Sequence, residues 1–530
     1  MSAKSSYQLP RRWAETTLGA IQLDIATGID PTRAPYTMFE LYSVPSHQHG
    51  MPEVVLGNQI GSNKRTVEQD TVLLCKINPR INRVWIVGSY SEHAKIASTE
   101  WLPFFPLSGL DPRYLAYYLR QNIIRDYLAS NASGVGGSLM RVRAATFKEL
   151  KFRVAPMIEQ TRIAEALDEL FSDLDAGVAA LERARDRLNI YRASVLKAAV
   201  EGTLTADWRV AHPHAEPASE LLKRVLAERR RRWEEEQLRK FAEKRKVPPK
   251  NWRARYKEPV SPDTADLPSL PEGWVVTSMD AVTSRITSGS RDWRRYYGEG
   301  SGTFIMAQNV SPGQYNPAFR QAVNPPPEDP SCERSLVQID DLLVTIVGAN
   351  TGDVCRIRLP LVDHYVCQSV ALMRPTHRTL SSFLDVYCNS PSGAQFHYNR
   401  YLYGAGRPHL SFDQLRMTPV VLPPEAEQHA IVNTVDDMLS SIDHIGANIR
   451  TKLKSVQRLR QAILRYAFTG SLVPQDPNDE PASELLKRIA NEREARARDA
   501  AATRRTAKIK TGGRASRRDR RRKTVVEAAR

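Results

Sequence analysis

Two long segments of the chain carry apolar residues at helical spacing. Each segment follows a proline, Pro156 in the first half and Pro424 in the second. Apolar residues then recur every three or four positions, which places them on one face of a helix. Gly202 and Gly470 follow the stripes, as is typical of residues that end helices. The predicted stripe residues are Ile163, Leu167, Leu170, Leu174, Val178, Leu181, Leu188, Tyr191 and Val195, and then Ile431, Val435, Met438, Ile442, Ile445, Ile449, Leu453, Val456, Leu459, Ile463 and Tyr466.

Each helix is predicted to run for about 40 residues, or roughly 60 Å at 1.5 Å per residue. A helix of that length cannot bury its stripe on itself. The simplest arrangement pairs the two helices as an antiparallel coiled coil. The alternative is that each helix packs only on its own globular part.

The two halves of the chain repeat each other. The nonamer EPASELLKR occurs at 216–224 and again at 480–488. The predicted helices also align, with EQTRIAEALDELFSDLD at 159–175 over EQHAIVNTVDDMLSSID at 427–443. Repeats of this kind indicate one architecture used twice.

The repeat begins with a shared motif and then diverges. LPRRWAETTLGAI at 9–21 matches LPEGWVVTSMDAV at 270–282, whereas residues 22–146 and 283–411 match poorly. Each half therefore combines a constant helical frame with a variable globular part.

The variable parts alternate strand-like and helix-like patterns. Strand-like runs occur at 70–90 and 339–358, and each part then has one predicted helix, at 114–128 or 381–397. A Gly-rich loop follows in both, at 133–143 and 403–411. The predicted fold class is α/β (α+β), with two mixed α/β domains separated by the paired helices in a pseudo-two-fold repeat. The predicted boundaries are 1–155 for the first variable domain, 156–224 for the central helical region, 225–268 for a charged helix and linker, 269–422 for the second variable domain, 423–490 for the C-terminal helical region and 491–530 for a basic, disordered tail.

The formal net charge of +17 and the pI of about 9.6 favour a polyanionic partner, with nucleic acid as the first candidate. Residues 504–523 carry eleven Lys or Arg and one Asp, so removing them leaves +7. Residues 224–258 are dense in charges of both signs and are predicted to form a solvated helix and linker. Five scattered cysteines, no signal peptide and no long apolar run favour a cytoplasmic protein without a membrane span.

No catalytic or metal site is predicted. Asn324 begins an Asn-Pro-Pro-Pro run that lacks the aromatic residue a methyltransferase uses to stack a flipped adenine. The segment 57–64 lacks the spacing of a phosphate-binding loop. The pairs His47/His49 and His212/His214 have no marked third ligand and are interpreted as loop residues.

DNA contacts are predicted from basic and amide side chains in the variable parts. Arginine and lysine can bind phosphates or guanine, and asparagine or glutamine can read adenine. For any single residue, ordinary surface charge is an equally good interpretation. The candidates are Lys64, Arg65, Arg80, Arg83, Arg141, Arg143, Arg291, Arg294, Arg295, Gln308, Asn309, Arg407 and His409.

The doubled order of motifs resembles the specificity subunits of type I restriction-modification systems. The motifs are L-P-x-x-W, a β-rich variable region, and then Glu159-Gln160 or Glu427-Gln428 before a long helix. FIMAQNV at 304–310 and DDLLVTIVGANTGDV at 340–354 are similar to target-recognition domains of that family.

The resemblance implies a non-catalytic protein with two target-recognition domains. Each domain would read one half of a split site in double-stranded DNA, and the helices would fix the gap between the halves. Two methylation subunits and the restriction subunits would be its partners. S-adenosylmethionine, ATP and magnesium would bind only to those partners, so no cofactor is expected on this chain. The alternatives are a self-contained methyltransferase or nuclease with recognition domains, and a coiled-coil scaffold that binds DNA through its basic tail.

Overall fold

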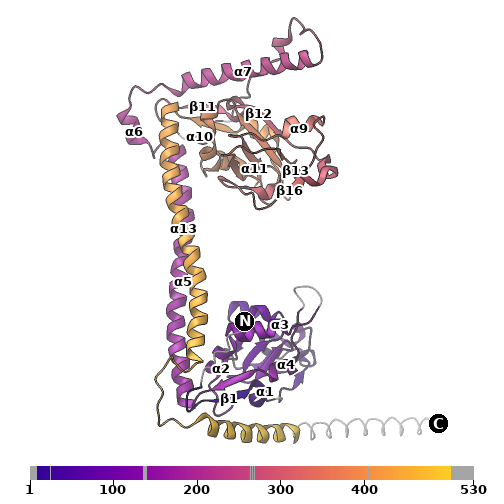
Figure 1. The fold of residues 1–530 in the computed structure, drawn as a ribbon, viewed down its shortest axis with the longest axis vertical. Coiled ribbons are helices and arrows are strands. Elements are labelled where there is room, and N and C mark those ends of the chain that lie inside the picture. Colours follow the sequence, from indigo (N-terminus) through magenta and orange to yellow (C-terminus); the bar gives the residue numbers. More distant parts are fainter. Residues whose placement is uncertain are drawn as a thin grey trace, which may run out of the picture. The chain divides into compact units, whose positions relative to one another are not determined.

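A computed structural model describes residues 9–502 except 24, 135–139, 263, 265–266, 268, 403–405 and 407. The chain divides into two compact units (Figure 1). The first unit comprises Met1–Leu181 and Thr451–Arg530, and the second comprises Glu182–Arg450.

The first unit contains a globular part of short strands and helices. Its helices are α1 (Leu18–Ile21), η1 (Pro31–Arg33), η2 (Ser46–His49), η3 (Gly57–Gln59), η4 (Pro79–Ile81), α2 (Pro112–Leu119), α3 (Asn122–Ser130) and α4 (Ala144–Lys148). Its strands are β1 (Ala14–Thr17), β2 (Gly28–Ile29), β3 (Met38–Tyr42), β4 (Glu53–Leu56), β5 (Lys64–Thr66), β6 (Val72–Cys75), β7 (Val84–Ile86), β8 (Ala94–Ser98), β9 (Trp101–Phe104) and β10 (Lys151–Val154).

The strands form a five-stranded sheet ordered β2-β5-β8-β3-β4, a three-stranded sheet ordered β7-β6-β9, and the antiparallel pair β1-β10. Strand β6 is buried throughout, because its residues Val72 to Cys75 face cores on both sides of the sheet. The larger core lies between this sheet, α2, α3, the start of the long helix that follows β10 and the end of the second long helix, at Leu464 and Ala467.

The second unit contains the other globular part. Its helices are α6 (Ala206–Ala211), α7 (Ala218–Glu243), η5 (Trp252–Arg255), α8 (Met279–Val282), η6 (Asp292–Tyr296), η7 (Ala307–Asn309), α9 (Pro330–Ser335), α10 (Arg378–Asn389), α11 (Ala394–Leu402) and α12 (Phe412–Met417). Its strands are β11 (Val275–Ser278), β12 (Thr283–Ser288), β13 (Tyr297–Ile305), β14 (Val310–Ser311), β15 (Gln314–Tyr315), β16 (Gln321–Val323), β17 (Leu342–Thr345), β18 (Val354–Arg356), β19 (His364–Val366), β20 (Val370–Pro375) and β21 (Pro419–Leu422).

The two globular parts share a topology despite their poor sequence match. A buried strand lies between two antiparallel neighbours in each, β6 between β7 and β9 and β17 between β18 and β20. Each part also has one parallel pair, β3 with β8 and β13 with β19. The first and last strands of each part pair antiparallel, β1 with β10 and β11 with β21. The mixed α/β fold class is therefore confirmed for both parts.

The prediction of one helix in each variable part is wrong, because both stretches break. Helices α2 and α3 are separated at Arg120 and Gln121, and Gln121 has extended backbone angles. Helices α10 and α11 are separated by residues 390–393, which include Pro391, and a proline restricts the residue before it, here Ser390, to extended conformations. The breaks let each pair of short helices bury more than one face.

The two long helices are present as predicted. Helix α5 runs Met157–Val200 and helix α13 runs Glu425–Ala467. A proline, Pro156 or Pro424, immediately precedes each helix. Gly202 and Gly470 both have a φ of +75°, a left-handed conformation that favours glycine at a helix end.

Ion pairs show that the helices run antiparallel within each unit. In the first unit Asp175 of α5 pairs with Arg460 of α13, and in the second Arg192 of α5 pairs with Asp443 of α13. These are the same pair of the repeat, because each residue lies 268 positions from its counterpart. The alternative in which each helix packs only on its own globular part is thereby excluded.

The stripes were predicted only in part. The buried stripe residues are Ile163, Leu167, Val195, Ile431, Val435, Ile442 and Ile449. The predicted stripe was wrong at the exposed residues, because the buried seam is narrower than the stripe: exposed Ile445, for example, lies between buried Ile442 and buried Ile449. The exposed stripe residues are Leu170, Tyr191, Ile445, Leu459 and Tyr466.

The nonamer repeats begin helices that cap the globular parts. Helix α7 begins within the first nonamer, and Arg229 on it donates to the carbonyl of Asp280 at 3.0 Å. The second nonamer begins a helix described over 482–502, where Arg493 donates to the carbonyl of Ala20 at 2.7 Å. Arg229 and Arg493 are equivalent in the repeat, so the same clamp is used twice.

Candidate nucleic-acid interface

The shared sequence motifs form a buried hydrogen bond in each unit. The indole Nε1 of Trp13 donates to Oε1 of Glu159 at 3.0 Å. The indole Nε1 of Trp274 donates to Oε2 of Glu427 at 2.8 Å. The tryptophan of L-P-x-x-W therefore ties the start of each globular part to the first turn of a long helix.

The glutamine of each motif adds a second tie. Gln160 donates from Nε2 to the carbonyls of Ala155 at 2.9 Å and Gly109 at 3.2 Å. Gln428 donates in the same way to the carbonyl of Pro423 at 2.9 Å. Both glutamines are buried, so each helix start has a defined orientation relative to the globular part of its own unit.

The two buried glutamates differ in their surroundings. Glu427 also accepts hydrogen bonds from Thr205 at 2.7 Å and from Arg209. Among the described residues, Trp13 is the one side chain that donates to Glu159. Burial raises the pKa of Glu159 above its ordinary value, and the Trp13 hydrogen bond offsets part of that rise.

Several predicted DNA-binding residues gather on one surface of the first globular part. Lys64 and Arg65 lie on β5, and Lys76 follows β6. Arg141 forms an ion pair with Glu100 at 2.8 Å. Glu100, Arg65 and Arg141 all act electrostatically on Lys76, so these charges lie close together.

The Gly-rich loop of the first part is anchored at this surface. Arg141 forms β-bridges with Ile77 and Ser133, and the amide of Asn78 donates to the carbonyl of Met140 at 2.8 Å. Residues 135–139 of the loop lie outside the described residues. The anchoring brings Arg141 beside Lys76, although the two are distant in sequence.

Lys64 is 6% exposed, which separates it from the other basic residues here. Its ammonium donates to the carbonyl of Ser62 at 2.9 Å and to the Ser62 hydroxyl at 2.6 Å. Burial lowers the pKa of Lys64, and burial also lowers that of Lys76. Lys64 lines a cavity of about 510 Å³ together with Ile77, Ser98 and Glu100.

The remaining candidates of the first part differ in exposure. Arg80 in η4 and Arg143 before α4 are exposed. Arg83 is half-buried, and its charge acts on the buried thiol of Cys75. Sequence reasoning missed Glu100, whose pairing with Arg141 only the tertiary structure brings about.

Three candidates of the second part lie together around η6. Arg291, Arg294 and Arg295 are exposed, while Trp293 between them is fully buried and holds the segment in place. Arg295 lies 4.8 Å above the ring of Tyr296 and 3.9 Å from the carboxylate of Asp329. In this segment the arginines are therefore exposed to solvent, and Trp293 anchors the segment in the core.

Gln308 and Asn309 differ although they are adjacent. Gln308 is exposed. Asn309 is fully buried; its Oδ1 accepts from the amide of Met306 at 2.9 Å, and its Nδ2 donates to the carbonyls of Asn316 at 2.8 Å and Phe319 at 2.7 Å. In this conformation the Asn309 amide supports a loop and has no free group for a base.

The last two candidates belong to the second Gly-rich loop. His409 is exposed and forms a β-bridge with Val347, as Arg141 does with Ile77 in the first part. Arg407 lies outside the described residues. Over the described part of the chain, no group of His, Cys, Asp and Glu could hold a metal ion. Within the same part, every helix is too short or too polar to cross a membrane.

The family model of the type I restriction modification DNA specificity domain matches residues 32–182. Over this range the chain is similar to a type I DNA specificity domain. The matched range covers most of the first globular part and the first half of α5.

Similarity to specificity subunits extends over most of the chain. The chain is 23% identical over 394 residues to the EcoKI specificity subunit of Escherichia coli (strain K12), with 72% of each chain covered. It is 60% identical over 48 residues to the EcoEI specificity subunit of Escherichia coli, which is 9% of this chain and 8% of that one. The predicted resemblance to this family is confirmed.

A chain in a solved structure of a type I restriction-modification system has the same fold. The TM-score is 0.63 at 18% identity, and the match covers 88% of this chain and 100% of the other. This likeness supports the two-domain architecture with long helices.

Proposed function

We propose that this chain is the DNA-specificity subunit of a type I restriction-modification complex. The observation that carries the proposal is the duplicated frame: each unit uses the same Trp–Glu hydrogen bond and the same strand pair to attach a different globular part to a long helix. One frame with two unlike heads suits a protein that reads the two unlike halves of a split site.

Each globular part would read its half-site through exposed basic and amide side chains. Exposed Arg141 and half-buried Arg65 and Lys76 support this role in the first part, and exposed Arg291, Arg294 and Gln308 support it in the second. Phosphate contacts would position the protein, and contacts to base edges would give specificity.

The chain would act without catalysis of its own. Methylation subunits would dock on the long helices and supply S-adenosylmethionine chemistry, and restriction subunits would supply ATP- and magnesium-dependent cleavage. Exposed apolar side chains on these helices, among them Ile190, Tyr191 and Leu459, support a protein-docking role. A cytoplasmic location would follow from this assignment.

Mapping methylated adenines in the host genome, with and without this protein, tests the proposal. We expect a split motif whose methylation disappears when the gene is deleted. Replacing residues 1–155 with the first domain of another specificity subunit should change one half of that motif only. The proposal would be contradicted if every methylated motif persisted after the gene is deleted. It would also be contradicted if the domain replacement changed both halves of the motif.

Three further experiments separate this function from its alternatives. Methylation or cleavage of DNA by the purified chain alone would favour a self-contained enzyme. Loss of all DNA binding on deletion of 504–530 would favour a scaffold that binds through its tail. Insertion of four residues, about one helical turn, near Arg187 should change the tolerated gap between half-sites, and an unchanged gap would remove the role of the helices in spacing.

A further inference from the structure

Outside its C-terminal tail, the positive charge of the chain is concentrated in one segment. Residues 224–258 contain fourteen Lys or Arg and six Glu, a net charge of +8. Removing this +8 and the +10 of residues 504–523 from the total of +17 leaves −1 for the rest of the chain. A polyanion attracted by this protein would therefore meet residues 224–258 or the tail first.

The segment remains largely exposed, as predicted, with Val225 and Trp252 as its buried residues, and it is attached to the second unit at a few points. Helix α7 is clamped by Arg229, whose guanidinium contacts Asp280 at 3.3 Å and the Tyr256 hydroxyl at 2.6 Å. Trp252 stacks on Trp233 with ring centroids 5.9 Å apart. The returning segment around η5 therefore lies against the same helix that precedes it.

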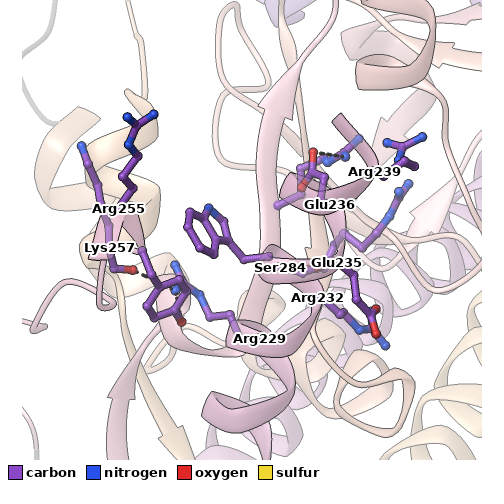
Figure 2. Close-up of a pocket in the computed structure, with 12 residues that line it drawn as sticks. Arg229, Arg232, Glu235, Glu236, Arg239, Arg255, Lys257 and Ser284 are labelled. Atoms are coloured by element: carbon purple, nitrogen blue, oxygen red, sulfur yellow. Dashed lines mark hydrogen bonds and ion pairs between the residues drawn. The ribbon is translucent and has the colours of Figure 1, made fainter. Parts of the chain in front are cut away.

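A groove of about 570 Å³ lies between α7, this returning segment and strand β12 (Figure 2). Seven of its twelve lining residues are Arg or Lys and two are Glu. Figure 2 shows Arg255 and Lys257 on one side of the groove, with Glu236 and Arg239 on the other. The lining residues are Arg229, Arg232, Trp233, Glu235, Glu236, Arg239, Arg255, Tyr256, Lys257, Ser284, Arg285 and Arg374.

Most of the groove's arginines are held by acids. Arg374 binds Asp341 with two contacts of 2.7 Å, Arg232 pairs with Glu228 at 2.7 Å, and Arg285 lies 3.5 Å from Glu236. These ion pairs line the groove, and in each of them the acid neutralises the charge of the arginine.

Arg255 and Lys257 differ from those arginines. Both side chains are exposed, and neither has an ion-pair partner among the described residues. The backbone carbonyl of Lys257, and not its side-chain ammonium, accepts a hydrogen bond from Arg229 at 3.2 Å. The two cations therefore line the groove without a neutralising acid among the described residues, beside a packed cluster in which Trp233 stacks on Trp252 and the Tyr256 ring is contacted by Arg229 and Arg230.

We infer that this groove grips the phosphate backbone of DNA, with Arg255 and Lys257 as the phosphate-binding residues. The inference rests on the proposed function for its choice of DNA over an acidic protein, because the second globular part, which shares strand β12 with the groove, would already hold DNA. These phosphate contacts do not depend on the base sequence, and they add affinity to the sequence-specific contacts of the two globular parts.

The test measures the salt dependence of binding between the full-length chain and a mixed-sequence duplex of about 40 base pairs. Each neutralised phosphate contributes about 0.9 to the slope of log affinity against log salt. The variant R255Q/K257Q should reduce the magnitude of the slope by about 1.8. Between about 50 and 200 mM salt, the wild type should then lose about tenfold more affinity than the variant.

Two controls separate this role from general charge and from folding. K452Q/K454Q removes from α13 two exposed cations that have no ion-pair partner in the part of the chain that the structure describes, and it should leave the slope unchanged. R255K/K257R keeps both charges and should retain the wild-type slope. Equal thermal unfolding of all variants shows that the groove remains folded.

The outcomes also distinguish the groove from the proposed function. A slope that is equal in R255Q/K257Q and the wild type overturns the inference. If that variant instead loses only its co-purifying methylation subunits, the groove is a protein-docking site. A wild-type complex that never distinguishes a split site from mixed sequence would refute the proposed function. In that case the comparison of slopes would still show whether Arg255 and Lys257 bind phosphates.

Discussion

Replacing each motif tryptophan by phenylalanine should cost the first unit more stability than the second. Trp13 and Trp274 occupy equivalent positions and are 7% and 6% exposed. Both substitutions shrink the ring by the same amount, so the cavity cost is similar in the two units. The difference comes from the glutamate that loses its indole donor.

The magnitude follows from the partners that remain. In W274F, Glu427 keeps the hydrogen bonds from Thr205 and Arg209. In W13F, no other described side chain donates to the buried Glu159. A hydrogen bond to a charged group contributes about 1.5–3 kcal/mol, and a neutral-strength loss costs about 1 kcal/mol. We therefore expect W13F to destabilise its unit by about 0.5–2 kcal/mol more than W274F does.

The pH dependence gives the prediction a second signature. Because the folded-state pKa of Glu159 is raised, the folded chain holds this proton more tightly than the unfolded chain. The stabilisation that comes from protonated Glu159 is fully present below the ordinary glutamate pKa of about 4.3. It is lost as the pH rises through the pKa that Glu159 has in the folded chain. Removing the Trp13 donor raises that pKa further, so the extra cost of W13F should grow from acid to neutral pH.

Hydrogen exchange read by mass spectrometry measures the two units separately in the full-length chain. At about 1.4 kcal/mol per tenfold change, W13F should accelerate exchange in β10 about 2- to 30-fold more than W274F accelerates it in β21. The double variant W13F/E159Q, which removes the charge, should recover part of the loss at neutral pH. Equal effects in the two units, or a larger effect of W274F, would refute the reasoning.

Three other outcomes are expected. N309A should lower the stability of the second unit by about 1–3 kcal/mol in urea unfolding without changing the bases read, because Asn309 supports a loop, whereas Q308A should alter readout and leave stability unchanged. R374M should lower the stability of the second unit by about 3–5 kcal/mol in calorimetry, because it leaves Asp341 buried without its partner, and an effect below about 1 kcal/mol would contradict a buried pair. R460E should cost at most about 1 kcal/mol in thermal unfolding, because the pair with Asp175 is largely exposed, and D175R/R460E should restore that loss.

Much of the architecture could be predicted because its signals are local or repeated. The apolar period between Pro156 and Gly202 defines one long helix, and the constant offset of the repeat predicts its partner. The equivalence of Asp175–Arg460 with Arg192–Asp443 follows from the same repeat once the helices are known to be antiparallel. Periodicity and duplication need no knowledge of distant contacts, so the sequence alone carries them.

Only the tertiary structure decided which candidate side chains can reach a ligand. Lys64 and Asn309 look like Arg65 and Gln308 in sequence, yet both are buried and bound to nearby backbone groups. Arg229 and Arg255 belong to one charge-dense run, but the first is a clamp and the second is exposed and unpaired. Exposure depends on chain segments that lie far away in sequence, because burial removes water from a charge only where those segments close over it.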